Sequence, residues 1–168
     1  GYSQTDNEFD AERALDAHQV PAYVSLAHIY VEQLGKTTLA DRTMEACVAA
    51  NRDSAEAYLA RGEHFIRRAL KESGQARDDL FANGESDIRH AAQLSPGDAE
   101  VIGALADVEI RKGDLESAKV WLARGMETYP QRESFFRARA SIALKEKQTA
   151  EARQSRSYAE DGRSIACG

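Results

Sequence analysis

The chain has 168 residues, of which 42% are hydrophobic and 30% charged, and it carries a formal net charge of −6. This composition is typical of a folded globular chain, and the acidic balance argues against nucleic-acid binding, which needs a basic face. No apolar run approaches the roughly 20 residues that a bilayer requires, and the polar, acidic start lacks the pattern of a signal peptide, so we expect no membrane insertion.

The first predicted element is a helix within residues 1–19. The stretch EFDAERALDAHQ has a helical pattern and leads directly into Val20 and Pro21. Its place in the architecture depends on the pattern that follows it.

From Val20 onward, large and small side chains recur at fixed spacing. Counted from the first residue of a unit, large residues occupy positions 4, 7, 11 and 24, and small residues occupy positions 8, 20 and 27. With one extra residue allowed in the turn near Gly35, the first unit has Tyr23, Leu26, Tyr30 and Met44 as large residues and Ala27, Ala40 and Cys47 as small ones. Because a small side chain lets a neighbouring helix approach and a large one fills the gap, this alternation predicts two closely packed amphipathic helices.

A second unit begins at Ala55. Its positions 4, 8 and 11 are Tyr58, Gly62 and Phe65. The unit has 44 residues, 10 more than the 34-residue unit that begins at Ala99, and the extra residues fall within LKESGQARDDLFANGESD, residues 70–87. Two interpretations remain open. The insertion either lengthens both helices of the pair by about one turn, or it forms a disordered loop, which Gly74 and Gly84 favour.

The third unit begins at Ala99 and has the most complete pattern. Its positions 4, 7, 8, 20, 24, 27 and 32 are Ile102, Leu105, Ala106, Ala118, Leu122, Gly125 and Pro130. Between its helices, Gly113 is suited to the left-handed conformation that ends a helix, and Asp114 is suited to capping the next one. Pro96 and Pro130 lie 34 residues apart, which sets the length of the repeat.

A fourth unit begins at Glu133. Phe136 and Ala140 take its positions 4 and 8, and Ala152 and Ala159 take positions 20 and 27. We therefore expect one more helix pair, followed by a tail.

Four registered copies of a 34-residue helix–turn–helix pattern resemble the tetratricopeptide repeat (TPR) family, from Val20 to about Ala159. An ordinary helical bundle shares the helical periodicity but does not predict the registered spacing. The resemblance implies an all-α fold, a right-handed α-solenoid of about four tandem helix–turn–helix units. The predicted division is a helix of a preceding partial repeat at 1–19, repeat 1 at 20–54, repeat 2 with the insertion at 55–98, repeat 3 at 99–132, and repeat 4 with a tail at 133–168. Because a repeat array needs capping units, a start on half a repeat suggests a segment of a larger TPR protein.

Three charged residues depart from the pattern. Position 7 is Arg61 in the second unit and Arg139 in the fourth, and position 11 of the third unit is Glu109. These residues indicate either exposed, less tightly packed positions or altered contacts.

The sequence shows no set of residues with catalytic or metal-binding spacing. The histidines and the two cysteines, Cys47 and Cys167, form no zinc pattern, and no nucleophile-elbow, phosphate-loop or dinucleotide motif occurs. Glu63 and His64 are adjacent and so point to different helix faces. Cys47 lies in an apolar helix and is expected to be a packing residue. We predict a protein that is not an enzyme and needs no cofactor or metal ion.

In the TPR family, the first helix of each unit lines a concave surface, and positions 2, 5, 9 and 12 make most ligand contacts. Transferred by position, the resemblance implies a partner-binding groove made of Val24, His28, Val31, Glu56, Leu59, Glu63, Ile66, Glu100, Gly103, Asp107, Ile110 and Arg137. Its apolar patches and acidic centre favour a partner segment that carries Lys or Arg beside aliphatic side chains. The alternative is that these carboxylates are only the solvated side of helices.

Co-chaperone members of the family grip an acidic carboxy-terminal peptide with Lys and Asn side chains of the groove. The corresponding places in this sequence are Val24, His28, Ala60, Glu100 and Ala104. The resemblance therefore does not imply that kind of clamp.

The function predicted from these patterns is a protein–protein interaction module that binds a partner peptide or protein segment in the groove. The alternative is a structural spacer or self-assembly segment of a longer repeat protein, with no ligand in the groove. The sequence leaves the partner, the compartment and the oligomeric state open.

Overall fold

The computed structural model describes residues 19–166, with side chains through residue 154. Its helices are α2 (Val20–Glu32), α3 (Thr37–Ala50), α4 (Ala55–Ala69), α5 (Gly74–Leu94), α6 (Ala99–Lys112), α7 (Leu115–Thr128) and α8 (Glu133–Ala166). This described part of the chain contains no strand, and the predicted all-α fold of helix–turn–helix repeats is confirmed. The helix predicted at 1–19 and the residue Cys167 lie outside the described residues, except for Gln19.

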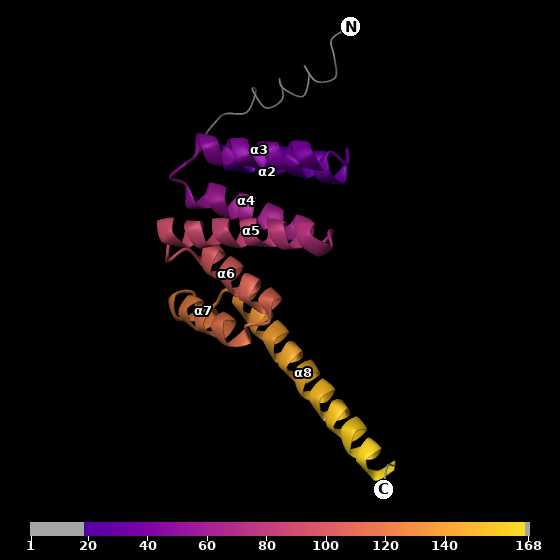
Figure 1. Cartoon of the computed structure of the whole chain (residues 1–168). Coiled ribbons are helices and arrows are strands. Elements are labelled where there is room, and N and C mark those ends of the chain that lie inside the picture. The colour runs from indigo at the N-terminus through magenta and orange to yellow at the C-terminus, as the bar shows by residue number, and fades with distance from the viewer. Residues whose placement is uncertain (1–18, 167–168) are drawn as a thin grey trace. The chain divides into compact units, whose positions relative to one another are not determined.

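The chain divides into two compact units, residues 1–104 and residues 105–168, and the division falls within α6. In the first unit, α2 packs against α3, α3 against α4, and α4 against α5, so that two helical hairpins follow one another (Figure 1). In the second unit, α7 packs against α8.

The turns form where the sequence places glycine and capping side chains. Gly35 and Gly113 have φ angles of 64° and 85°, in the left-handed region that glycine adopts without strain. Ser54 accepts a hydrogen bond from the backbone N–H of Ala57 at the start of α4. Asp114 accepts one from the N–H of Ser117 at the start of α7, which confirms its predicted role as a cap.

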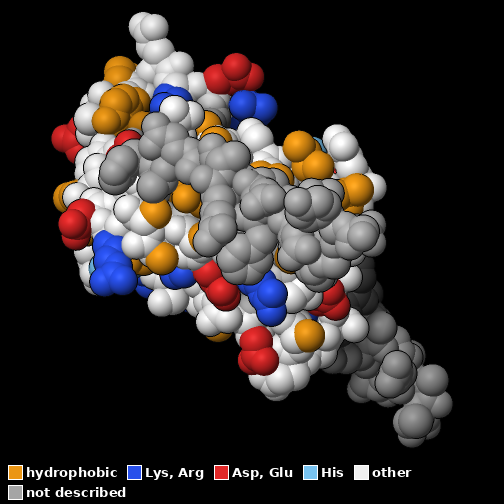
Figure 2. Space-filling view, turned by 90° about the horizontal axis from the view of Figure 1, so that it is seen from above, with side chains coloured by type: hydrophobic (Ala, Val, Ile, Leu, Met, Phe, Trp, Pro, Cys, Tyr) orange, Lys and Arg blue, Asp and Glu red, His pale blue; other side chains and the backbone are white. Residues whose placement is uncertain are grey.

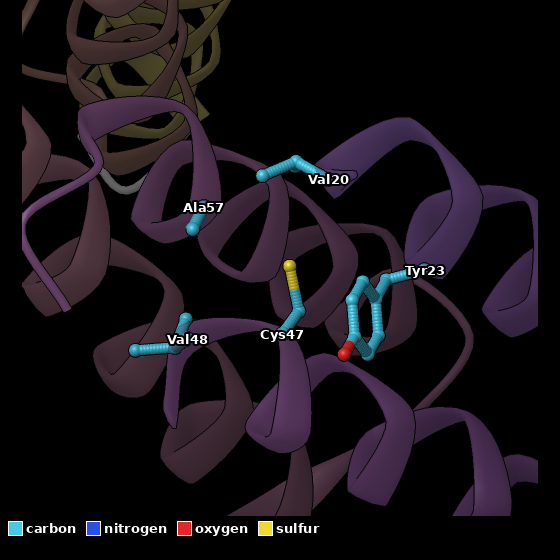
Figure 3. Close-up of a cluster of buried hydrophobic side chains, with 5 residues drawn as sticks. All are labelled: Val20, Tyr23, Cys47, Val48 and Ala57. Atoms are coloured by element: carbon cyan, nitrogen blue, oxygen red, sulfur yellow. The ribbon is translucent and has the colours of Figure 1, made fainter. Parts of the chain in front are cut away.

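A cluster of buried side chains joins the first three helices. It consists of Val20, Tyr23, Cys47, Val48 and Ala57 (Figure 3). The Cys47 side chain lies among its neighbours with no exposed surface, and burial raises the pKa of its thiol to about 11. The thiol is therefore protonated and unreactive at neutral pH, as expected for a packing residue.

Two glycines allow α4 and α5 to cross at short distance. A Cβ atom added at Gly62 would lie 2.9 Å from the carbonyl oxygen of Gly84, and one added at Gly84 would lie 2.7 Å from the carbonyl oxygen of Gly62. Gly62 is the small residue that the repeat pattern predicts. The interpretation of the insertion as a disordered loop, which Gly84 favours at the level of the sequence, is wrong. Gly84 is buried inside helix α5.

The insertion lengthens one helix of the second unit. Helix α5 has 21 residues, whereas α4 has 15 and α3 has 14. Only Leu70–Ser73 separate α4 from α5. The extra residues are therefore taken up mostly by the first turns of α5, where residues 74–79 are exposed.

The unexpected Arg61 forms an ion pair inside the α4–α5 hairpin. Its guanidinium donates to both carboxylate oxygens of Asp87, each at 2.7 Å. Asp87 is buried, and the guanidinium also lies over the Tyr58 ring. Arg61 thus marks an altered contact, in which two parallel hydrogen bonds replace apolar packing.

The predicted helix pair of the fourth unit does not form. Helix α8 runs without interruption from Glu133 to Ala166, so Ala152 and Ala159 belong to the same helix as Phe136. The reason is local, because the stretch ALKEKQTAEARQ has strong helix formers and lacks the glycine and capping residue that separate α6 from α7. The packing register also differs by one residue, since Phe135 is fully buried whereas Phe136 is 42% exposed.

Lysines attach α8 to the rest of the second unit. Lys145 donates a hydrogen bond to the carbonyl oxygen of Ile110 near the end of α6. Lys119 of α7 bonds to Glu116 on its own helix and to Glu146 on α8. A lysine that satisfies a carbonyl in the last turn of a helix also complements the helix dipole.

We predict that Gly84→Ala lowers the free energy of unfolding by about 1–3 kcal/mol, because the added methyl group meets backbone atoms of α4. Alanine is the better helix former, so intrinsic propensity alone predicts the opposite sign. Urea unfolding followed by circular dichroism at 222 nm measures the change. Gly97→Ala is the matched control, since a Cβ atom there meets nothing within 4 Å. A Gly84→Ala variant as stable as the parent would contradict the close crossing.

Candidate functional site

The first unit contains a hollow of about 300 Å³. It lies between α2 and α4 and extends to Met44 of α3 and to the turn after α4. Its lining residues are Val24, Ala27, His28, Val31, Glu32, Met44, His64, Arg67, Arg68, Leu70 and Lys71. Three of the predicted groove residues, Val24, His28 and Val31, line this hollow.

Apolar side chains form much of the hollow's surface. Val24, Ala27 and Val31 repeat every three or four residues and so lie on one stripe of α2. Met44 and Ala27 are buried, whereas Leu70 is 58% exposed at the edge. An apolar hollow with an exposed apolar edge is suited to hold a hydrophobic side chain of another molecule.

One wall of the hollow is held by a network between α3 and α4. His64 Nε2–H donates to Asp41 Oδ1 at 2.7 Å, and Arg68 Nη1 donates to the other carboxylate oxygen. Burial alone would raise the pKa of Asp41, but the hydrogen bonds from His64 and Arg68 outweigh it and lower that pKa below its ordinary value. The network therefore fixes the Arg68 guanidinium in place.

The rim of the hollow carries exposed ion pairs. Lys71 Nζ lies 2.7 Å from Glu32 Oε1, and this contact lowers the pKa of Glu32. Arg67 Nη1 lies 3.6 Å from Glu63 Oε2 on the preceding turn of α4. Such exposed pairs contribute little to stability and exchange partners readily.

The remaining predicted groove residues of the first unit have mixed positions. Glu56, Glu63 and Glu100 are exposed, and Leu59 and Gly103 are half-buried. Ile66 was expected on the groove, but this is wrong. Its side chain is 5% exposed and lies against Gly84, inside the α4–α5 hairpin.

The second unit holds three of the predicted residues. Asp107 Oδ2 accepts from Arg111 Nε at 2.5 Å, one helical turn further along α6. Ile110 is 5% exposed, so its side chain offers almost no surface to a partner, contrary to expectation. Arg137 is exposed and lies 3.7 Å from Glu133.

Sequence reasoning missed the cations at the hollow. Arg67, Arg68 and Lys71 stand outside the groove positions that the family resemblance implies, near the end of α4. The signal was present as the basic cluster RRALK at a helix C-terminus, where the helix dipole favours positive charge. Their position beside α2 depends on how the two hairpins pack, which no local pattern encodes.

Within the described residues, no three His, Cys, Asp or Glu side chains are placed to hold a metal ion. No helix among these residues is long and apolar enough to cross a membrane. Where described residues are visible, Figure 2 shows acidic, basic and apolar side chains interspersed on the surface.

Two family models described as tetratricopeptide repeat match the chain, one at residues 20–54 and the other at residues 81–142. Together they cover more than half of its length. The chain belongs to the tetratricopeptide repeat family. No curated protein matches the sequence of this TPR chain.

TPR membership indicates a protein–protein interaction module in general terms. Members of the family are typically non-catalytic scaffolds that bind proteins or peptides. The apolar hollow beside the first helices of this TPR chain is consistent with such a role.

We predict that Asp41→Asn destabilises the TPR chain by about 1.5–3 kcal/mol at pH 7, because hydrogen bonds to a charged group are lost. The pKa of Asp41 is lower in the folded chain than its ordinary value of 3.8. The stabilisation of the folded chain by the Asp41 carboxylate is therefore complete above pH 3.8 and disappears as the pH falls through the lowered pKa of this group. Urea unfolding at several pH values checks this expectation. The difference between parent and variant should shrink below about pH 4, while Asp53→Asn, an exposed control, should have little effect at any pH.

Proposed function

We propose that the chain binds a segment of a partner protein along the first helices of its repeats. The observation that carries this proposal is the hollow beside α2 and α4, with its apolar surface and its three predicted groove residues. Burying an apolar side chain there would supply most of the binding free energy, since apolar burial contributes about 25 cal/mol per Å². The neighbouring polar side chains would orient the segment.

The charges along α4 support a partner with basic groups at one end of the segment. Glu56 lies in the first turn of α4, is exposed, and stands beside the half-buried Leu59. Glu100 is exposed in the first turn of α6. We infer that Lys or Arg side chains of the partner lie near these carboxylates, beside aliphatic side chains that contact Leu59. Gly103 in the first unit, and Asp107 and Arg137 in the second, remain proposed contact positions.

A second function has one observation in its favour. Phe136 and Leu144 are exposed on α8, at 42% and 58%. A TPR unit stacks its apolar faces on neighbouring units, so exposed apolar residues on the last described helix favour a segment that stacks within a larger TPR protein. In that case the repeats would serve as a spacer and the hollow would have no ligand.

Site-specific photocrosslinking tests the binding proposal. With p-benzoylphenylalanine in place of His28, we expect crosslinks to a discrete set of proteins in lysate of the source cells, because that side chain is exposed and lines the hollow. The control carries the same group in place of Val120, which is 69% exposed on the second helix α7. Mass spectrometry would identify the crosslinked peptides. Equal crosslinking at both positions, or none at His28, would leave the spacer function as the better account.

A further inference from the structure

We propose that Asn83 is a site of spontaneous deamidation, which the α4–α5 hairpin prevents while it is closed and which destabilises that hairpin once it has occurred. Asn83 is directly followed by Gly84 near the middle of α5, and the Asn83 side chain is exposed. The inference concerns the covalent integrity of the chain and does not depend on the proposed binding function.

The reaction needs only water and the chain itself. The backbone nitrogen of Gly84 bonds to the side-chain amide carbon of Asn83, and the amide nitrogen leaves as ammonia together with the proton of the attacking N–H. Water then opens the resulting succinimide ring at either carbonyl group. The product is aspartate, or isoaspartate, whose backbone continues through the side chain and is one carbon atom longer. A following glycine favours the ring because it has no Cβ atom to obstruct the attack.

The helical conformation of α5 keeps the reacting groups apart. In an α-helix ψ is about −42°, and each backbone N–H is donated to a carbonyl group one turn earlier. The ring can close only when ψ of Asn83 rotates away from this value and the N–H of Gly84 is released. Both changes require α5 to open locally. The exposed Asn83 side chain is therefore protected by the backbone and not by burial.

The close crossing of the two helices opposes such an opening. A Cβ atom added at Gly84 would lie 2.7 Å from the carbonyl oxygen of Gly62 and 2.8 Å from Cγ1 of Ile66. About one turn further along α5, Asp87 is held by the guanidinium of Arg61. Unwinding α5 at this place would separate these groups, so it is coupled to the opening of the hairpin as a unit. The rate of deamidation should then follow the population of the open hairpin.

Isoaspartate at position 83 would not fit the closed hairpin. Its extra backbone atom comes directly before Gly84, where the two helix backbones leave no room. It also breaks the regular spacing of the hydrogen bonds in α5. The modified hairpin would therefore open more readily, and no later step restores the parent chain. Because α4 supplies His64, Arg67 and Arg68 to the hollow, the modification would also disturb the candidate site from a distance.

Peptide mapping by mass spectrometry tests the protection. The full chain is kept at mildly alkaline pH, either folded or in guanidinium chloride, and the deamidated fraction at Asn83 is followed with time. We expect the folded chain to react at least about a hundredfold more slowly than the unfolded chain. Gly62→Ala presses on the crossing from α4 and leaves the Asn83–Gly84 bond unchanged, so it should raise the rate in the folded chain about tenfold. Gly97→Ala is the matched control, since a Cβ atom there meets nothing within 4 Å, and it should leave the rate unchanged.

A second comparison separates the change of backbone from the change of charge. The isoaspartate form is prepared by ageing the unfolded chain, refolding it and purifying it by ion exchange. It should unfold at a lower urea concentration than Asn83→Asp, which carries the same charge on an ordinary backbone, or fail to refold where Asn83→Asp refolds. Circular dichroism at 222 nm follows both chains.

Three results would overturn the inference. They are equal rates of deamidation in the folded and unfolded chain, no increase of the rate with Gly62→Ala, and equal urea midpoints for the isoaspartate form and Asn83→Asp. None of these measurements involves a bound partner, so the proposed function is tested separately by the crosslinks at His28.

Discussion

The close crossing of α4 and α5 is the constraint on which the first unit depends. Gly62 and Gly84 each face the backbone of the other helix, so no larger residue fits at either place without a shift of the helices. Helix α4 then presents Glu56 in its first turn and Arg67 and Arg68 in its last. Because the helix is held on one side by α5, its opposite side is left to contact α2 and α3, where the hollow forms.

Polar contacts between helices complete this arrangement. The Arg61–Asp87 pair connects α4 to α5, and the Asp41 network connects α3 to α4. No buried side-chain N or O atom among the described residues lacks a hydrogen-bond partner. Satisfied polar networks of this kind are sensitive to helix rotation and register, because a misplaced helix would leave charged groups unpaired. They therefore help to position the wall of the hollow as well as to stabilise the hairpins.

The proposed function rests on the hollow beside α2 and α4, where apolar and charged side chains lie together. The TPR family typically provides non-catalytic scaffolds, and this chain offers an apolar hollow with exposed ion pairs at its edge. In the proposed binding function, apolar burial in this hollow would provide the affinity. The exposed Phe136 and Leu144 on α8 are a separate feature, on which the alternative stacking function rests.

The sequence alone determined the helix–turn–helix pattern as far as α7 and the family, because periodicity, left-handed glycines and N-caps act within a few residues. It wrongly predicted a turn within the segment that forms the single helix α8. The predictions for Gly62, Gly113 and Asp114 rested on such local signals. Only tertiary packing decided that the Ile66 side chain is buried against Gly84 rather than exposed on the groove. It also decided that Arg67, Arg68 and Lys71 line the hollow. Contacts such as Asp41 with His64, 23 residues apart, and Glu32 with Lys71, 39 apart, depend on the rotation and crossing of helices. Helix periodicity predicts which residues share a face, but the packing of several helices decides which faces meet.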